Sequence, residues 1–191
     1  MATTRPRERI LAAATRLFAD EGIHATSVDR VIAEAGVAPM TVYRHFAGKD
    51  ELVTATLERW SGEWLGRLRD ESGPGDDAGS RLEGLWDALE KWFANEGFRG
   101  SYVDNVATEL RAKPGHPAQP TIAAHRATLR ELLREIAAEA GAASPTGAAL
   151  QLHMLVDGAA AAAVVDRQPG AAASARAIAT TVLSERQPVR A

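Results

Sequence analysis

Cysteine is absent from this chain of 191 residues. That absence excludes disulfide bonds, thiolate metal sites and cysteine nucleophiles, and it is typical of proteins of the reducing cytoplasm, where we expect this one. Aromatic residues are also scarce, at 5%. The first residues lead directly into an amphipathic pattern, so we expect no signal peptide, and we find no run of about 20 apolar residues that predicts a membrane span.

The chain also lacks a large excess of either positive or negative charge, because its formal net charge is only −3. Residues 1–50 carry seven basic and six acidic side chains, a net charge of +1, which leaves −4 for the remainder of the chain. A balance this close to neutral permits nucleic-acid binding without indicating it.

Helical periodicity is what the chain has in abundance. Apolar residues recur at spacings of three and four, and no segment alternates with turn residues as a strand would. Several helix starts and stops are marked by proline and glycine, such as Pro6, Gly22, Pro145 and Gly141. The sequence therefore predicts an all-α fold of about nine helices, with a loop over residues 72–80.

The most informative stretch is residues 26–50, in which two short helices flank a tight turn. We expect Thr26 to cap the first of them, with Asp29 as its partner in a capping box. Gly36 ends that helix, and Pro39 begins the next one at a position where its missing N–H costs nothing.

The second of these helices has an apolar and a polar face. Val42 and Phe46 lie four residues apart and face inward. On the outer face, Arg44 can bond guanine, and the methyl groups of Thr41 and Met40 can contact thymine. Phosphate oxygens are within reach of Tyr43 and Lys49 on the flanks. This pattern is typical of a DNA recognition helix, although the aromatic residues can also be read as the core of a small helical module.

Residues 35–52, A-G-V-A-P-M-T-V-Y-R-H-F-A-G-K-D-E-L, resemble the helix-turn-helix of the tetracycline-repressor (TetR/AcrR) family of bacterial transcriptional regulators. Two positions depart from the family pattern. Ala38 replaces a usual Ser and so lacks a hydroxyl for capping or phosphate contact, and Met40 replaces a usual Gly and adds bulk near the DNA. The matching positions are Thr26, Ile32, Ala33, Ala35, Gly36, Val37, Thr41, Tyr43, His45, Phe46, Lys49 and Leu52.

The resemblance implies a homodimeric regulator, more often a repressor, that binds a palindromic DNA operator and is released by a small-molecule effector. It implies a helix-turn-helix domain over residues 1–48 and a ligand-binding and dimerisation domain over residues 49–191. The alternative is a helical small-molecule-binding protein whose helix-turn-helix does not serve DNA recognition. We expect no enzymatic activity, cofactor or metal, because no nucleophile–base pair or metal-ligand cluster is evident.

With the resemblance, the expected DNA contacts are Thr26, Ser27, Ala38, Pro39, Met40, Thr41, Tyr43, Arg44, His45 and Lys49. The arginines that lead into the first helix can touch phosphate or remain solvated. Aromatic and polar residues of the middle and later helices can line an effector cavity or belong to an ordinary core. The effector candidates are Trp60, Trp64, Trp86, Phe93, Tyr102, Val106, His125, Leu129, Met154 and Asp157.

Alanine dominates the last two expected helices, near residues 145–185. Small side chains let helices approach closely, and two helices from each of two protomers form a self-complementary four-helix interface. The alternative is that these helices pack only within their own protomer. We expect the dimer interface here, because so many alanines give a poor core for a single layer.

Overall fold

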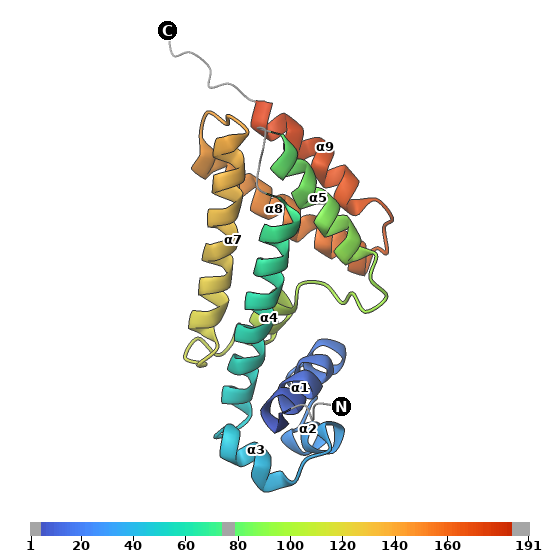
Figure 1. The fold of residues 1–191 in the computed structure, drawn as a ribbon, viewed down its shortest axis with the longest axis vertical. Helices are drawn as coiled ribbons and strands as arrows, with labels where there is room; N and C mark the ends of the chain where they lie inside the picture. Colours follow the sequence, from blue (N-terminus) through green and yellow to red (C-terminus); the bar gives the residue numbers. More distant parts are fainter. Residues whose placement is uncertain (1–4, 74–78, 185–191) are drawn as a thin grey trace. The chain divides into compact units, whose positions relative to one another are not determined.

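The computed structural model describes residues 5–73 and 79–184, which form nine α-helices and no strand (Figure 1). This result confirms the predicted all-α class. The helices are α1 (Pro6–Glu21), α2 (Val28–Ala35), α3 (Pro39–His45), α4 (Lys49–Glu71), α5 (Ser80–Phe93), α6 (Tyr102–Glu109), α7 (Gln119–Glu139), α8 (Pro145–Val165) and α9 (Ala171–Ser184). Of the predicted loop at residues 72–80, residues 74–78 lie outside the described ranges, and Ser80 already belongs to α5.

Local signals in the sequence set several helix ends. Pro6 occupies the first position of α1, where its fixed φ suits a helix and no N–H is needed. Gly36 ends α2 in the left-handed conformation at φ +60° and ψ 43°. Ser144 accepts a hydrogen bond from the N–H of Gly147 and is followed by Pro145, as predicted for the start of α8.

Packing divides the chain into two compact units. Unit 1 comprises residues 1–63 and 102–125, and unit 2 comprises residues 64–101 and 126–191. Helix α4 therefore passes from one unit to the other after Glu63, and α7 does so after His125. In this division by packing, the first part of α4, all of α6 and the first residues of α7 belong with the helix-turn-helix.

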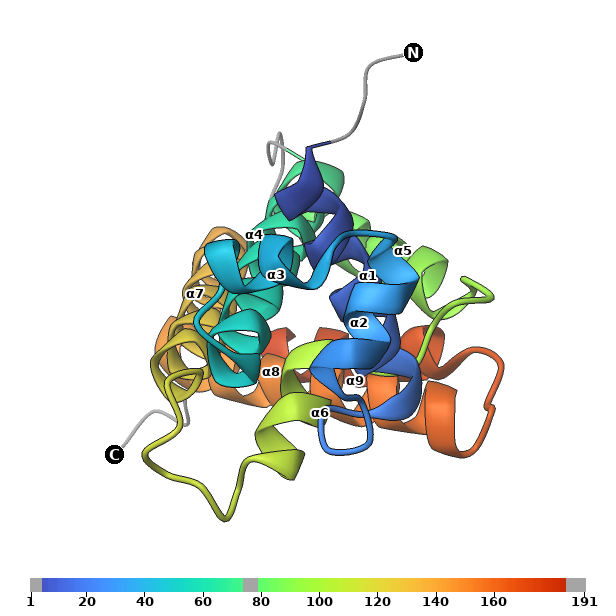
Figure 2. The ribbon, with the colours of Figure 1, turned by 90° about the horizontal axis from the view of Figure 1, so that it is seen from below.

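One apolar core holds unit 1 together. Helix α1 packs against α2 and α3, and the same core includes residues of α4, α6 and α7 (Figure 2). Complete burial of one large apolar side chain contributes about 1.5–3 kcal/mol to the free energy of folding, relative to leaving the side chain exposed. Core residues that are almost completely buried include Ile10, Leu17, Val31, Val42, Phe46, Leu52, Leu57, Val103, Val106 and Leu110.

In unit 2, helix α9 packs along α8 and also against α5 (Figure 1). Ala160 of α8 and Ala179 of α9 are buried, which permits close approach of the helix backbones. The guanidinium of Arg176 on α9 pairs with two carboxylates of α5, those of Glu83 and Asp87. The alanine-rich helices therefore have one face packed within their own protomer.

The expectation that no segment is long and apolar enough to span a membrane is wrong for α8. By length and composition this helix passes that test, with a mean hydropathy of 1.5 over its most apolar window, of which 39% is buried inside the chain. The reason is the alanine run near its C-terminal end, since alanine counts as apolar. Core helices of soluble proteins pass the same test, and Asp157 within α8 forms an ion pair with Arg126 of α7 at 2.9 Å.

Candidate nucleic-acid interface

Two neighbouring hydroxyls before α2 have different partners. The Oγ of Ser27 accepts a hydrogen bond from the backbone N–H of Arg30 at 3.1 Å, so Ser27 is the N-cap of α2. Thr26 is instead buried and donates its hydroxyl proton to the carbonyl of Gly22 at 2.8 Å. The prediction that Thr26 caps α2 is therefore wrong, and its side chain has no exposed surface for DNA. Asp29 becomes the second helical residue, one place short of a capping-box partner.

The turn between α2 and α3 is held by an arginine of α1. Arg9 donates from Nη2 to the carbonyl oxygens of Ala35 at 2.6 Å and Gly36 at 2.7 Å. These carbonyls lie at the C-terminal end of α2, where a positive charge complements the helix dipole. Arg9, one of the leading arginines, therefore holds this turn as well as keeping part of its surface accessible. Arg7 lies over the ring of Phe46, 5.4 Å from its centroid.

Helix α3 has the two faces that its sequence predicts. Val42 and Phe46 are 2% exposed and anchor the helix and its C-cap in the core of unit 1. On the opposite side, Met40 is 76% exposed and Tyr43 is 50% exposed. Arg44 is exposed as well. Large apolar and aromatic side chains are thus exposed on the side of α3 that faces away from the core.

The remaining predicted DNA contacts lie around this exposed face. Ala38 precedes α3 and forms no side-chain capping bond, as expected from its missing hydroxyl. Ser27, Ala38 and Pro39 are exposed, whereas Thr41, His45 and Lys49 are half-buried. Nine of the ten predicted residues therefore keep accessible surface, and Thr26 does not.

Charges near α3 favour an anionic partner. Among the residues that the structure describes, Arg44 and Lys49 have no ion-pair partner. The nearest carboxylate in sequence, that of Asp50, lies 3.2 Å from the Nε2 of the buried His116 in the loop between α6 and α7. A contact over this distance in sequence leaves no periodic signal, and sequence analysis did not find it.

Four predicted effector residues belong to unit 1, and three of them are already engaged there. The Tyr102 hydroxyl lies 2.9 Å from the Oγ1 of Thr56, and the Oγ of Ser61 lies 2.8 Å from the Nδ1 of His125. The half-buried ring of Trp60 lies 5.8 Å from that of Tyr102 and 5.9 Å from that of His125. Burial raises the pKa of Tyr102 above its ordinary value. The fourth candidate, Val106, is fully buried in the same core.

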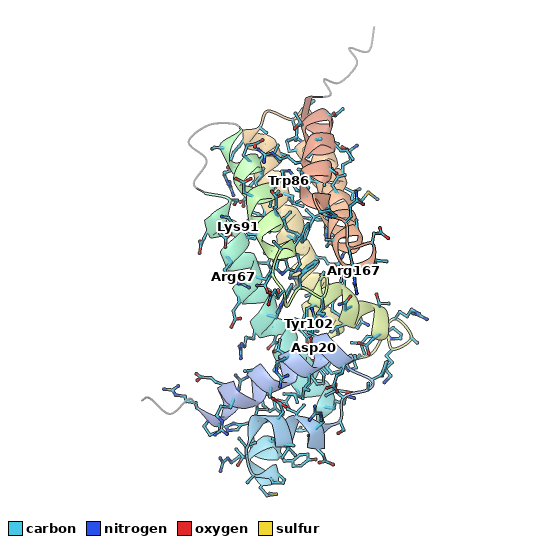
Figure 3. All side chains as sticks on the ribbon, turned by 90° about the vertical axis from the view of Figure 1, so that its right-hand side faces the viewer. Asp20, Arg67, Trp86, Lys91, Tyr102 and Arg167 are labelled. Atoms are coloured by element: carbon cyan, nitrogen blue, oxygen red, sulfur yellow. The ribbon has the colours of Figure 1, made fainter. Side chains whose placement is uncertain are left out.

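The other six belong to unit 2 and differ widely in exposure. Trp64 and Leu129 are buried, and Met154 is 66% exposed, so that it lies on the surface of this protomer. Asp157 is half-buried and pairs with Arg126, while Phe93 packs against neighbouring rings of the cluster that contains Trp92 and Phe98. Trp86, labelled on α5 in Figure 3, is 1% exposed, and its Nε1–H has no acceptor among the described residues.

Glu109 at the end of α6 is a residue that sequence analysis missed. Its carboxylate accepts two hydrogen bonds at 2.9 Å from the backbone N–H groups of Ile23 and His24 in the turn between α1 and α2. No signal in one sequence links the turn to a glutamate more than eighty residues away.

The chain is similar to known proteins in sequence and in structure. Residues 10–56 match the family model described as bacterial regulatory proteins, tetR family. A solved structure, that of SCO4454, a TetR-family transcriptional regulator from Streptomyces coelicolor, is 31% identical. The alignment covers 93% of this chain and 94% of that one, with a TM-score of 0.86.

Curated relatives match over a shorter span. The transcriptional activator FasR of Mycolicibacterium smegmatis is 31% identical over 107 residues, which are 54% of this chain and 48% of FasR. The transcriptional repressor KstR2 of Rhodococcus jostii is 28% identical over 123 residues, or 55% of this chain and 59% of KstR2. The chain thus spans about half the length of these curated relatives.

Proposed function

We propose, since this chain belongs to the tetR family of bacterial regulatory proteins, that it is a DNA-binding regulator of transcription that responds to a small molecule. Members of this family are regulators and not enzymes. The observation that carries the proposal is the outer face of α3, where Met40, Tyr43 and Arg44 are exposed while Val42 and Phe46 fix the helix from behind.

The exposed residues divide by the kind of contact that they suit. Arg44 and Thr41 suit base edges in the major groove, whereas Tyr43 and Lys49 suit phosphates, which position the protein without specifying sequence. Met40 adds an apolar group for a thymine methyl. Arg44→Ala should therefore weaken binding to the operator by about 1–3 kcal/mol and relax discrimination at one base position per half-site.

Fluorescence anisotropy tests this division with two labelled duplexes, one selected by the wild-type protein from a random library and one of random sequence. Lys49→Ala should weaken both duplexes alike and make the salt slope shallower by about 0.9 per lost phosphate contact. Arg130→Ala, at an exposed arginine of unit 2, is the matched control for loss of a positive charge. The proposal fails if the wild-type protein does not distinguish the two duplexes.

The proposed effector site includes Trp86. Buried polar groups in proteins almost always have a partner, so an indole N–H at 1% exposure calls for an acceptor that the described residues do not supply. We propose an apolar effector that carries a hydrogen-bond acceptor. By linkage, effector and operator must weaken each other's binding by the same factor, commonly about 5–150-fold, which tryptophan fluorescence titrations with and without operator would measure.

We also propose that a second copy of the chain covers one face of α8 and α9. Four large apolar side chains remain more than half exposed on these helices, and α8 places three of them along one stripe: Leu150, Met154 and Val165, with Ile178 on α9. Gly158 and Ala161, exposed between them, would let two helices approach closely. The proposed occupant is a second copy because a two-fold axis makes such a surface complementary to itself.

The sign of regulation and the location complete the proposal. We propose repression, as in the relative named a repressor, and a cytoplasmic protein, since members of this family are soluble DNA-binding proteins. Another relative is named an activator, so activation is the alternative that the test must distinguish from repression. A reporter under the chain's own promoter should rise when the gene is deleted, and a fall would reverse the sign.

A further inference from the structure

The turn between α1 and α2 is fastened to α6 by one carboxylate. Oε1 of Glu109 accepts the N–H of Ile23, and Oε2 accepts the N–H of His24, both at 2.9 Å. The side chain of His24 also contacts Glu109, because its Nε2 lies 3.2 Å from the main-chain oxygen of that residue. A carboxylate that accepts from backbone N–H groups forms stronger and more directional bonds than neutral partners do.

The backbone of the turn is shaped around this carboxylate. Gly22 has φ +84°, in the region that favours glycine, and a Cβ there would come within 3.1 Å of the Oε1 of Glu109. Its own N–H bonds to Phe18 at the end of α1, so the next two N–H groups have no helical acceptor. Ile23 is buried beside them at 3% exposure.

Helix α6 is also fixed to the same unit along its length. Val106 and Leu110 are buried in the core of unit 1, and Tyr102 at the start of α6 bonds to Thr56 of α4. Apolar contacts permit small sliding, whereas two directional bonds do not. A displacement of α6 therefore moves the α1–α2 turn, and with it the start of α2.

We propose that Glu109 is a positioning residue for DNA binding, which sets the angle of α2 and α3 and passes movements of α6 to them. This inference rests on the proposed function and adds to it a residue that fixes the position of the DNA-reading helices. Nothing in the role requires Glu109 to touch DNA or effector.

The test compares Glu109→Ala and Glu109→Gln with the wild-type protein at 25 °C, well below the melting transitions recorded by circular dichroism. Glu109→Ala should lose operator affinity by a factor within the coupling range of about 5–150-fold, with random-duplex affinity changed by less than about twofold. Glu109→Gln, which keeps one acceptor, should show a smaller loss. Glu58→Gln removes an exposed carboxylate of the same unit and should change neither affinity.

A merely structural role would lower the melting temperature and leave operator affinity of the folded protein unchanged, which would overturn the proposal. An equal loss on both duplexes would also overturn it, because it would indicate general damage. Amide exchange in the wild-type protein tests the geometry independently of any variant, since the N–H groups of Ile23 and His24 should be protected. Failure of the wild-type protein to prefer its selected duplex would instead refute the proposed function.

Discussion

Replacing the two hydroxyls that meet between α4 and α6 should destabilise the protein unequally. Thr56 and Tyr102 are 0% and 3% exposed, and their oxygens lie 2.9 Å apart. The Thr56 hydroxyl donates its single proton to the carbonyl of Val53 at 2.8 Å, so the Tyr102 hydroxyl is the donor of the pair. The two substitutions therefore leave different groups behind.

Thr56→Val removes the acceptor and leaves a buried O–H donor without a partner, which costs about 1–3 kcal/mol. Tyr102→Phe removes the donor, while the Thr56 oxygen keeps its bond to Val53, so the cost is that of one ordinary hydrogen bond, about 0.5–1.5 kcal/mol. In the double variant neither group is stranded. Its cost should fall below the sum of the single costs by about 0.5–3 kcal/mol, the range for residues in contact.

Urea unfolding followed by circular dichroism measures these differences, provided that the slope with denaturant stays constant among the variants. The reasoning is refuted if Tyr102→Phe costs more than Thr56→Val, or if the two single costs add up to that of the double variant. Thr54→Val, at a half-buried hydroxyl on the same helix that bonds only within α4, is the control for a threonine-to-valine change.

Four further predictions each concern one residue. Ser27→Ala should lower the free energy of unfolding by about 0.5–2 kcal/mol through loss of the α2 cap, and an effect below the error of a urea titration would contradict that assignment. Burial raises the pKa of Tyr102 above its ordinary value of 10.0, so the unfolded chain releases this proton first. The free energy of unfolding should therefore fall as pH rises above about 10, and less steeply in Tyr102→Phe. Met154→Arg should shift sedimentation toward monomer, whereas an unchanged dimer would place the interface elsewhere. Gly62→Ala should stabilise α4 by about 0.5–1 kcal/mol, because a Cβ there meets nothing within 4 Å.

The helix-turn-helix could be predicted because its signals are local. Gly36 and Pro39 mark the turn, and the spacing of Val42 and Phe46 marks the buried face, so neighbours in sequence determine both. Thr26 and Ser27 show the limit of such reasoning. Either hydroxyl can cap a helix, and the choice depends on the carbonyl of Gly22, which accepts from Thr26 in the folded unit.

Contacts between distant segments could not be predicted from one sequence. Glu109 on the α1–α2 turn, Arg9 on the end of α2 and His116 beside Asp50 are all charged or polar residues of ordinary appearance. Their roles depend on tertiary geometry, and periodicity reports only the face of a helix. The prediction that no segment is long and apolar enough to span a membrane failed at α8 for a related reason, since alanine is apolar by composition whatever it packs against.

Unit 1 is assembled from two stretches of chain separated by residues 64–101. A ribosome has therefore released the helix-turn-helix before α6 exists, and until then the apolar surface that Val103, Val106 and Leu110 later cover is open to water or to chaperones. Recombination would meet the same constraint. A chimera that takes only the first fifty residues from a relative keeps a foreign α6 against them, and Gly22 would then face a side chain selected for another turn. Exchange of the DNA-binding unit between relatives should succeed when both stretches of unit 1 are taken from the same protein.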